Sequence, residues 1–319
     1  MFGGTDSFAL TARAARRPRR VLVRSALVAA VTTLAVACGG TDAGPVLTVG
    51  AGDSAQSRML AEIYAQALAR TGTRTATKDG LGPRAAQLAA LDANTVTVVP
   101  DVNGDLLAAL DSGSKATKPD AVTPALNSAL PEGLIVSDPA DGTDLRPTVV
   151  ALAARVDEFP ATLKDLAPRC PELTVGIATG PALDAMREPL DPDRDVRTPL
   201  RAVYSCDLTH TQTYPTDEAL RKALSAGDIQ LAVLSGPPAF LPDGGTDLTP
   251  IADPAYAFRT ANTLAVLRKS TLTTPQLRKL DYVAGELTTT DLADLIRQLR
   301  APGATPATLA RNWLDAHAL

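Results

Sequence analysis

The sequence contains few of the side chains that carry most enzyme chemistry. Of its 319 residues, two are histidine and three are cysteine. It also lacks the Gly-x-Ser-x-Gly, Gly-x-x-x-x-Gly-Lys and His-Glu-x-x-His motifs of hydrolases, phosphate-binding loops and zinc proteases. We therefore predict no catalytic residue, no metal and no cofactor. A catalytic pair of acidic side chains would leave no comparable sequence motif. An enzyme therefore stays among the hypotheses for this protein.

Aromatic residues are also scarce. They make up 3% of the chain, with only five tyrosines. Tyr64 and Tyr282 fall at positions of a helical period, which predicts that both lie in the core. Only Tyr204, Tyr214 and Tyr256 then remain to supply rings to a binding site.

Positive charge is concentrated at the start of the chain. Six arginines precede an apolar run of 13 residues, from Ser25 to Ala37. This run is too short to span the ~30 Å hydrocarbon core of a bilayer. The order of the two segments is typical of a signal peptide over residues 1–37. The pair Arg19-Arg20 leaves the general secretory and twin-arginine export routes both open.

The four residues at positions 35–38, Ala-Val-Ala-Cys, resemble the bacterial lipobox. This resemblance implies that Cys38 becomes the lipid-modified first residue of the mature chain. Residues 38–45 would then be a short tether, and the protein would lie at the extracytoplasmic face of the cell membrane. The alternative is an ordinary cleavage site followed by an incidental cysteine.

Removal of residues 1–37 makes the chain more acidic. Basic residues fall from 31 to 25 and acidic residues from 35 to 34, so the formal charge goes from −4 to −9. No basic cluster remains, and nucleic acid is therefore not an expected partner. Cys170 and Cys206 form an even pair in an oxidising compartment, which predicts a disulfide. Two buried free thiols are the alternative.

Strand and helix patterns alternate along the mature chain. Strands are predicted at 46–49, 73–77 and 95–99, with helices at 57–71 and 84–91 between them, which indicates a parallel α/β sheet. A second α/β unit is predicted from strands at 148–153, 173–178 and 229–234 and a helix at 217–225. Returning strands at 248–252 and 262–267 precede three helices, at 274–287, 290–299 and 306–317.

Several segments, in one order, are similar to a known family. They are the strand and turn at 47–53 with the helix at 59–68, the segment 80–91, and Val96 to Leu107, which resembles the pattern Asp-Val-x-Pro-Glu-Tyr-Thr-Gly. Residues 163–167 and 287–292 match two later segments. From Leu47 to about Leu314 the chain thus resembles the substrate-binding proteins of osmoprotectant ABC importers, the glycine betaine/choline family.

This resemblance implies a two-lobed type II periplasmic-binding-protein fold, with lobe 1 at 46–101 plus 250–319 and lobe 2 at 102–249. A small zwitterionic or polar solute would bind between the lobes and pass to an ABC permease and its ATPase. The protein would be a monomer. The alternative from another class is an envelope scaffold or sensor partner that no longer transports.

The resemblance also gives candidate ligand-binding residues. Gly52 and Asp53 end the first strand motif, whereas Asp101, Val102 and Asn103 replace the Glu-Tyr-Thr of the family pattern. The family holds quaternary ammonium groups in a cage of tyrosines, and Val102 removes one of them. An Asn-Gly turn at a lobe crossover is the alternative role for this segment.

Two arginines and one tyrosine complete the candidates. Arg187 aligns with a family arginine that meets the ligand carboxylate, and Arg84 at a helix start is expected to help hold an anion. Each is alternatively a solvated surface arginine. Tyr256 lies near the return crossover and is the best remaining aromatic residue, with interlobe packing as its alternative role.

Overall fold

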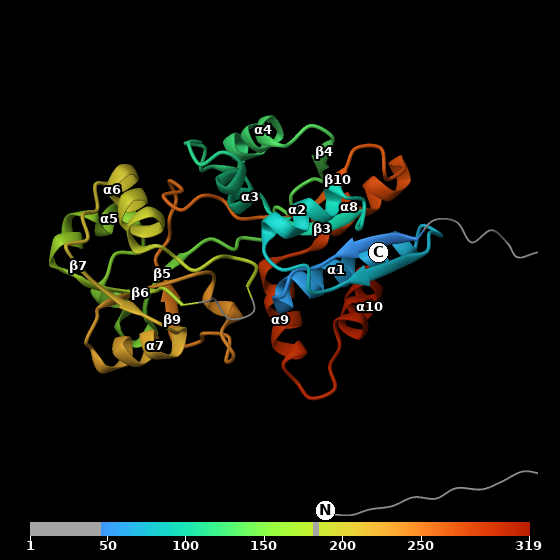
Figure 1. Cartoon of the computed structure of the whole chain (residues 1–319). Helices are drawn as coiled ribbons and strands as arrows, with labels where there is room; N and C mark the ends of the chain where they lie inside the picture. The colour runs from blue at the N-terminus through green and yellow to red at the C-terminus, as the bar shows by residue number, and fades with distance from the viewer. Residues whose placement is uncertain (1–45, 181–184) are drawn as a thin grey trace, which may run out of the picture. The chain divides into compact units, whose positions relative to one another are not determined.

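Two five-stranded mixed sheets, each with helices on its faces, organise the chain (Figure 1). The computed structural model describes residues 46–180 and 185–319. The predicted signal peptide and Cys38 therefore lie outside the described residues. Residues 44–319 form one compact unit. Across the two described ranges, every helix is too short or too polar to cross a bilayer.

The first sheet has the strand order β2-β1-β3-β10-β4. Strand β1 is parallel to β2 and β3, whereas β10 is antiparallel to β3 and β4. Each βαβ connection is short, as the alternating sequence pattern predicts. The strands are β1 (Leu47–Gly50), β2 (Thr75–Lys78), β3 (Val98–Val102), β4 (Leu134–Val136) and β10 (Thr263–Arg268).

Helices cover both faces of this sheet, because the strands are apolar on both sides. On β10, Ala265 and Leu267 belong to one core cluster, while Leu264 and Val266 belong to the other. This alternation follows from the two-residue period of a strand. The first face carries α1 (Ala55–Ala69), α8 (Thr274–Glu286), α9 (Thr289–Leu299) and α10 (Pro306–Ala316); the second carries α2 (Arg84–Asp92), α3 (Asn103–Leu110) and α4 (Pro119–Ala129).

Side-chain caps fix the starts of the long helices. The Ser54 hydroxyl accepts a hydrogen bond from the N–H of Ser57 at the start of α1. Thr288 and Asp291 form a reciprocal capping box at α9, and Thr305 caps α10 with Pro306 in the first turn. These caps satisfy N–H groups that have no partner within the helix.

The second sheet repeats the same arrangement with the order β7-β6-β8-β5-β9. Strand β6 is parallel to β7 and β8, and β5 is antiparallel to β8 and β9. Its strands are β5 (Thr148–Leu152), β6 (Thr174–Ala178), β7 (His210–Tyr214), β8 (Leu231–Leu234) and β9 (Leu248–Pro250). Helix α7 (Asp217–Ala226) covers one face. The other face is covered by α5 (Leu163–Leu166), α6 (Thr198–Tyr204) and the short turns η1 (Ala153–Glu158), η2 (Ala167–Glu172) and η3 (Pro192–Arg197).

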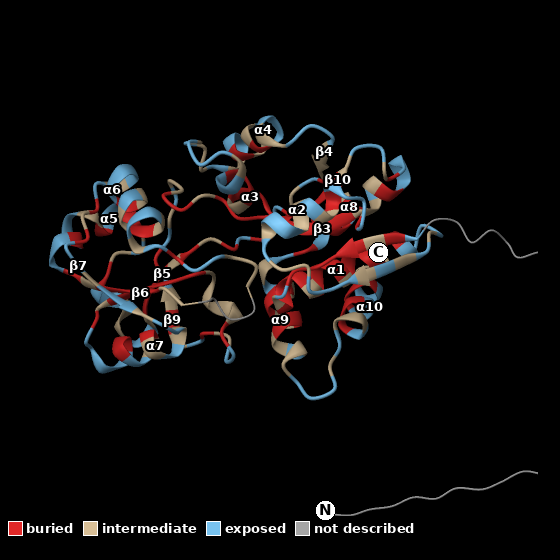
Figure 2. Ribbon diagram, in the orientation of Figure 1, coloured by how far each residue is buried: buried red, intermediate tan, exposed pale blue. Residues whose placement is uncertain are grey.

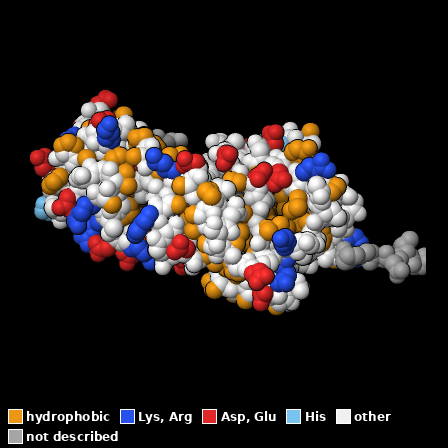
Figure 3. Space-filling model, turned by 90° about the horizontal axis from the view of Figure 1, so that it is seen from above, with side chains coloured by type: hydrophobic (Ala, Val, Ile, Leu, Met, Phe, Trp, Pro, Cys, Tyr) orange, Lys and Arg blue, Asp and Glu red, His pale blue; other side chains and the backbone are white. Residues whose placement is uncertain are grey.

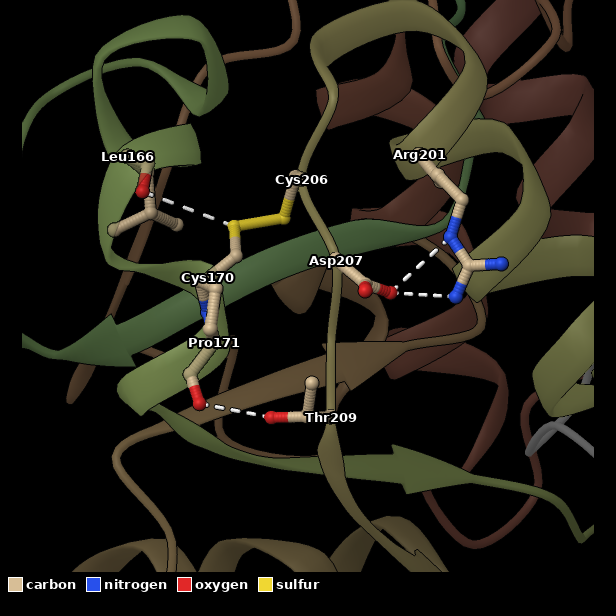
Figure 4. Close-up of a disulfide and its surroundings, with 7 residues drawn as sticks. All are labelled: Leu166, Cys170, Pro171, Arg201, Cys206, Asp207 and Thr209. Atoms are coloured by element: carbon tan, nitrogen blue, oxygen red, sulfur yellow. Dashed lines mark hydrogen bonds and ion pairs between the residues drawn. A yellow bond between two sulfur atoms is a disulfide. The ribbon is translucent and has the colours of Figure 1, made fainter.

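A disulfide joins the short segments on that second face (Figure 4). It links Cys170 in η2 to Cys206 just after α6, with Cα atoms 5.3 Å apart. Both residues are buried. Next to it, the Thr209 hydroxyl donates to the carbonyl of Pro171 at 2.8 Å. The two cysteines expected to pair are therefore bonded in the core of this half of the molecule.

We define lobe 1 as the first sheet with its helices and lobe 2 as the chain from β5 to β9. The predicted start of lobe 2 at residue 102 is wrong, because α3, α4 and β4 all pack on the first sheet. The predicted return at 250 is also early, since β9 pairs with β5 in lobe 2. Strand β4 has only three residues and pairs with β10, far away in the sequence, so local periodicity does not reveal it. Strand β9 was predicted as a strand, but its pairing with β5 is a long-range contact that the local pattern does not show.

Burial separates the two tyrosines predicted for the core. Buried residues lie on the strands and on the helix surfaces that face them (Figure 2). Tyr64 on α1 is 3% exposed, as predicted, but Tyr282 on α8 is 60% exposed. The helical period places Leu280 and Val283 against the sheet, which turns Tyr282 outward.

Charged side chains of both signs are interspersed on the surface in Figure 3, with no continuous basic patch on that face. Many arginines there and elsewhere pair with a nearby aspartate, such as Arg201 with Asp207 and Arg221 with Asp243. Such exposed pairs contribute little stability. They do, however, keep the arginines from forming a cationic surface of the kind that binds phosphate backbones.

Candidate functional site

A cavity of about 530 Å³ lies between loops of lobe 1 and residues 185–189 of lobe 2. Its lobe 1 wall comes from the turn after β1, the start of α1, the start of α2 and the end of β3. The carboxyl ends of parallel strands and the helices that follow them meet at one edge of a sheet, which is where ligands bind in open α/β folds. Its volume is in the range of small-molecule sites.

The turn after β1 runs close to α2 and to the segment that leads into it. A Cβ atom at Gly52 would lie 3.0 Å from the carbonyl oxygen of Gly82 and 2.6 Å from the Nε2 of Gln87. The N–H of Gly52 donates to the Ser57 hydroxyl at 2.8 Å. Asp53, the next residue, is exposed and lines the cavity. Gly52 thus shapes the wall and Asp53 supplies a carboxylate to it.

Arg84 and Asp101 form a bidentate ion pair in the same wall. Arg84 Nε lies 2.8 Å from Asp101 Oδ2, and Nη2 lies 2.8 Å from Oδ1. Their side chains are only 17% and 7% exposed. Burial raises the pKa of Asp101, while Arg84 and the N–H of Val102 act in the opposite direction. The charges of the two candidate residues therefore neutralise each other. Of the three guanidinium nitrogens of Arg84, only Nη1 makes no hydrogen bond to Asp101.

Arg187 connects lobe 2 to α3 of lobe 1. Its Nη2 lies 2.7 Å from Asp105 Oδ1 and its Nε lies 3.1 Å from Oδ2. The neighbouring N–H of Met186 donates to Gln56 Oε1 on α1 at 2.9 Å. Arg187 lines the larger cavity, but its guanidinium is already held by a carboxylate of the protein.

A second cavity, of about 40 Å³, adjoins the first at Arg187 and is mostly apolar. Val102 lines this smaller cavity and not the larger one, together with Phe240 from lobe 2. Asp217 also faces it, and burial raises the pKa of this carboxyl. The predicted role of Val102 at the ligand is therefore confined to a space about the size of one or two water molecules.

Asn103 is 1% exposed and belongs to a buried hydrogen-bond network. Its Oδ1 accepts from the N–H groups of Gly104 and Asn262, and its Nδ2 donates to Asn262 Oδ1. Asn262 in turn donates to the carbonyl of Thr143. These bonds join the start of α3 to both segments that run between the lobes. Asn103, predicted as a ligand-binding residue, lines neither cavity. It begins a helix within lobe 1, so it does not form the crossover turn that was its alternative role either.

Tyr256 lies against an arginine and lines neither cavity. The Arg146 Cζ atom is 4.3 Å from the centre of its ring. Arg146 also pairs with Asp144 and Asp253. Tyr256 has a φ of +59°, which is unusual for a residue other than glycine. Its ring is therefore used in packing beside the return segment, and the described cavity lining receives no ring from it.

Sequence reasoning missed five polar residues of the larger cavity. These are Ser54, Ser57, Arg58, Gln87 and Glu188. Arg58 lies between two buried positions of an amphipathic helix. The local sequence pattern therefore does not distinguish it from an ordinary surface arginine. The residues that line this cavity include no aromatic side chain. The described residues also contain no group of three or more acidic, histidine or cysteine side chains suited to a metal ion.

The chain belongs to the OpuAC family, the substrate binding domain of the ABC-type glycine betaine transport system, whose model matches residues 45–316. The predicted family is thus confirmed over most of the sequence. No curated protein matches the sequence significantly.

Solved structures share the fold at low sequence identity. A glycine betaine/carnitine/choline ABC transporter protein has a TM-score of 0.70 at 16% identity, covering 86% of this chain and 98% of its own. YehZ of Escherichia coli, without ligand, has a TM-score of 0.66 at 17% identity, covering 85% and 98%. Lactococcal OpuAC, closed around glycine betaine, scores 0.52 at 14% identity, covering 86% and 96%. The predicted two-lobed periplasmic-binding-protein fold is confirmed.

Proposed function

We propose that this protein is the extracytoplasmic solute-binding protein of an ABC importer and captures a small zwitterionic or polar solute. The observation that carries the proposal is the cavity of about 530 Å³ between the lobes, in a chain of the OpuAC family. Its charged lining suits a polar ligand. The permease and ATPase of the importer would be its protein partners, and the binding step involves no covalent chemistry.

Delivery to a permease requires both proteins at one membrane. We propose that the lipid on Cys38 provides this after removal of residues 1–37, and that the protein acts as a monomer. A single acyl chain binds membranes only marginally, whereas two or more chains give stable anchoring. Replacement of Cys38 by serine should release the protein from the membrane fraction. Retention of the C38S protein there would contradict the anchor.

The second candidate function is a scaffold or sensor partner that no longer transports. It is favoured by one observation, the absence of aromatic side chains from the larger cavity. The size of that cavity supports the transport proposal instead, since side chains of the protein have not filled the space.

Thermal unfolding of residues 44–319 with and without solutes separates these functions. The panel holds glycine betaine, choline, carnitine, proline betaine, amino acids and polyamines at millimolar concentration. A ligand at one hundred times its dissociation constant adds about 2.7 kcal/mol to the free energy of unfolding. A rise in the unfolding midpoint with one solute class is expected. No rise with any solute would overturn the transport proposal and favour the scaffold.

A further inference from the structure

Among the residues that the structure describes, one arginine of the larger cavity has no carboxylate partner. Arg84 and Arg187 are held by Asp101 and Asp105. Arg58, which lines the same cavity, forms no ion pair within the described residues.

The Arg58 side chain is also partly withdrawn from water. Its Nε atom is buried and has no hydrogen-bond partner in the described part of the chain. A buried donor without a partner is unfavourable, and native proteins seldom retain one. A guanidinium presents its donors in a planar fork that matches a carboxylate. The buried Nε atom has no accessible surface, so an anionic group of a ligand in this cavity would meet the Nη groups of Arg58, which form no ion pair within the described residues.

Two acidic residues of the cavity lining also have no ion-pair partner among the described residues. Asp53 and Glu188 are exposed at the cavity and form no ion pair or side-chain hydrogen bond within the ranges 46–180 and 185–319. They come from opposite walls, one from the turn after β1 and one from lobe 2. Within the described residues, the charged groups of the cavity that form no ion pair are therefore one arginine and two carboxylates, of which Glu188 also acts electrostatically on Arg84.

We propose that the solute is a compact zwitterion whose carboxylate binds Arg58 and whose ammonium group carries N–H donors for Asp53 and Glu188. This inference rests on the proposed function and specifies its solute. A quaternary ammonium has no N–H group, and its usual protein partner is a set of aromatic faces. This cavity supplies carboxylates and no ring. Replacing each N–H by a methyl group thus removes a hydrogen bond and gains no aromatic contact.

Matched pairs of solutes test this selectivity by titration calorimetry on residues 44–319. Each pair shares one carboxylate scaffold and differs in methylation at nitrogen: glycine and glycine betaine, β-alanine and its betaine, γ-aminobutyrate and its betaine, proline and proline betaine. Since a site built for hydrogen bonds rejects analogues that lack them, we expect the N–H member to bind at least about tenfold more tightly.

The role of Arg58 is tested by Arg58→Gln with Arg74→Gln as the matched control. Arg74 is exposed, lies outside the cavity and forms no ion pair within the described residues. We expect R58Q to weaken the tightest solute at least about tenfold, R74Q to leave it unchanged, and R58K to restore part of the loss. Unfolding midpoints without solute show whether R58Q still folds.

The outcomes separate this inference from the proposed function. Tighter binding of the betaine members, or unchanged binding by folded R58Q, would overturn the inference while the protein remains a solute-binding protein. The inference also fails if no member of any pair binds but another solute of the panel does. If R58Q does not fold, the methylation pairs alone decide. If no solute binds at all, the proposed function fails with it.

Discussion

The two lobes have the same strand order but cover their sheets differently. In each lobe three parallel strands are followed by an antiparallel strand and an edge strand. One face of the lobe 1 sheet carries helices of 15, 13, 11 and 11 residues. The corresponding cover in lobe 2 is made of α5 and α6, with four and seven residues, and of six-residue turns.

The two lobes thus cover the apolar face of a sheet in two different ways. A long amphipathic helix buries a continuous stripe and satisfies most of its own backbone hydrogen bonds. Short helical turns lack that internal support and depend on tertiary contacts. Lobe 2 adds the bond between Cys170 and Cys206 at this face, which restricts the unfolded chain. Lobe 1 contains no cysteine in its described residues.

Loss of this disulfide should have the largest effect on the free energy of unfolding. The double variant C170S/C206S opens a loop with a sequence separation of 36 residues, and loop closure predicts a loss of about 4 kcal/mol in the free energy of unfolding. Hydrogen exchange should rise in the amides of lobe 2 and stay low in α1 and α9. An equal rise in both lobes would mean that they unfold as one cooperative unit.

The next largest effect should come from removing an arginine–aspartate ion pair, and its size should differ between the two lobes. Asp101→Asn leaves the mostly buried Arg84 without its carboxylate and should cost about 3 kcal/mol in urea unfolding. Asp243→Asn should cost less than about 1 kcal/mol, because its partner Arg221 is more exposed and keeps Asp247. Similar losses for both variants would show that burial does not control these pairs.

A smaller effect should be the same in both lobes. Thr305 caps α10 in lobe 1 and Thr216 caps α7 in lobe 2, each through a hydroxyl that accepts from a first-turn N–H. Replacing either by alanine should cost about 1 kcal/mol, because a cap is a local contact. Serine at each position is the control and should retain most of the stability. A clearly larger loss in lobe 2 would mean that its helix depends more on the cap.

The last effect appears only at alkaline pH. Burial raises the pKa of Tyr64 in lobe 1, and burial with a hydrogen bond to Asp253 raises the pKa of Tyr204 in lobe 2 to about 12. Both hydroxyls lose their protons more easily in the unfolded chain, so stability present below pH 10 should fall as the pH rises through 12.

Burial and Asp228 also raise the pKa of Tyr214 in lobe 2. Ultraviolet titration of tyrosinate should therefore show Tyr64, Tyr204 and Tyr214 as late groups in the folded protein. Tyr204→Phe should remove one lobe 2 component and leave those of Tyr64 and Tyr214. If all tyrosines titrated together, the raised pKa of Tyr64 and of Tyr204 would be contradicted.

The sequence predicted most strands and long helices of lobe 1, because their apolar residues repeat at 3.6 or two positions over several turns or pairs. It missed α3 and β4, where the repeats are short, and α4, whose helical pattern contains Pro124. In the site, Gly52, Asp53, Arg84 and Asp101 were placed at the cavity by the family motifs that surround them. The sequence did not reveal that Arg84 and Asp101 bind each other, since 17 positions separate them.

The sequence by itself therefore determined the class of fold, the family and the scarcity of aromatic side chains, because these depend on composition and on local order. Only the tertiary structure decided which charges remain free at the cavity. The sequence does not distinguish Arg58 from Arg84 and Arg187. Long-range contacts give Arg84 and Arg187 carboxylate partners, whereas Arg58 has none among the described residues. Charge pairing depends on distances of a few ångströms between segments far apart in the chain, which no local pattern encodes.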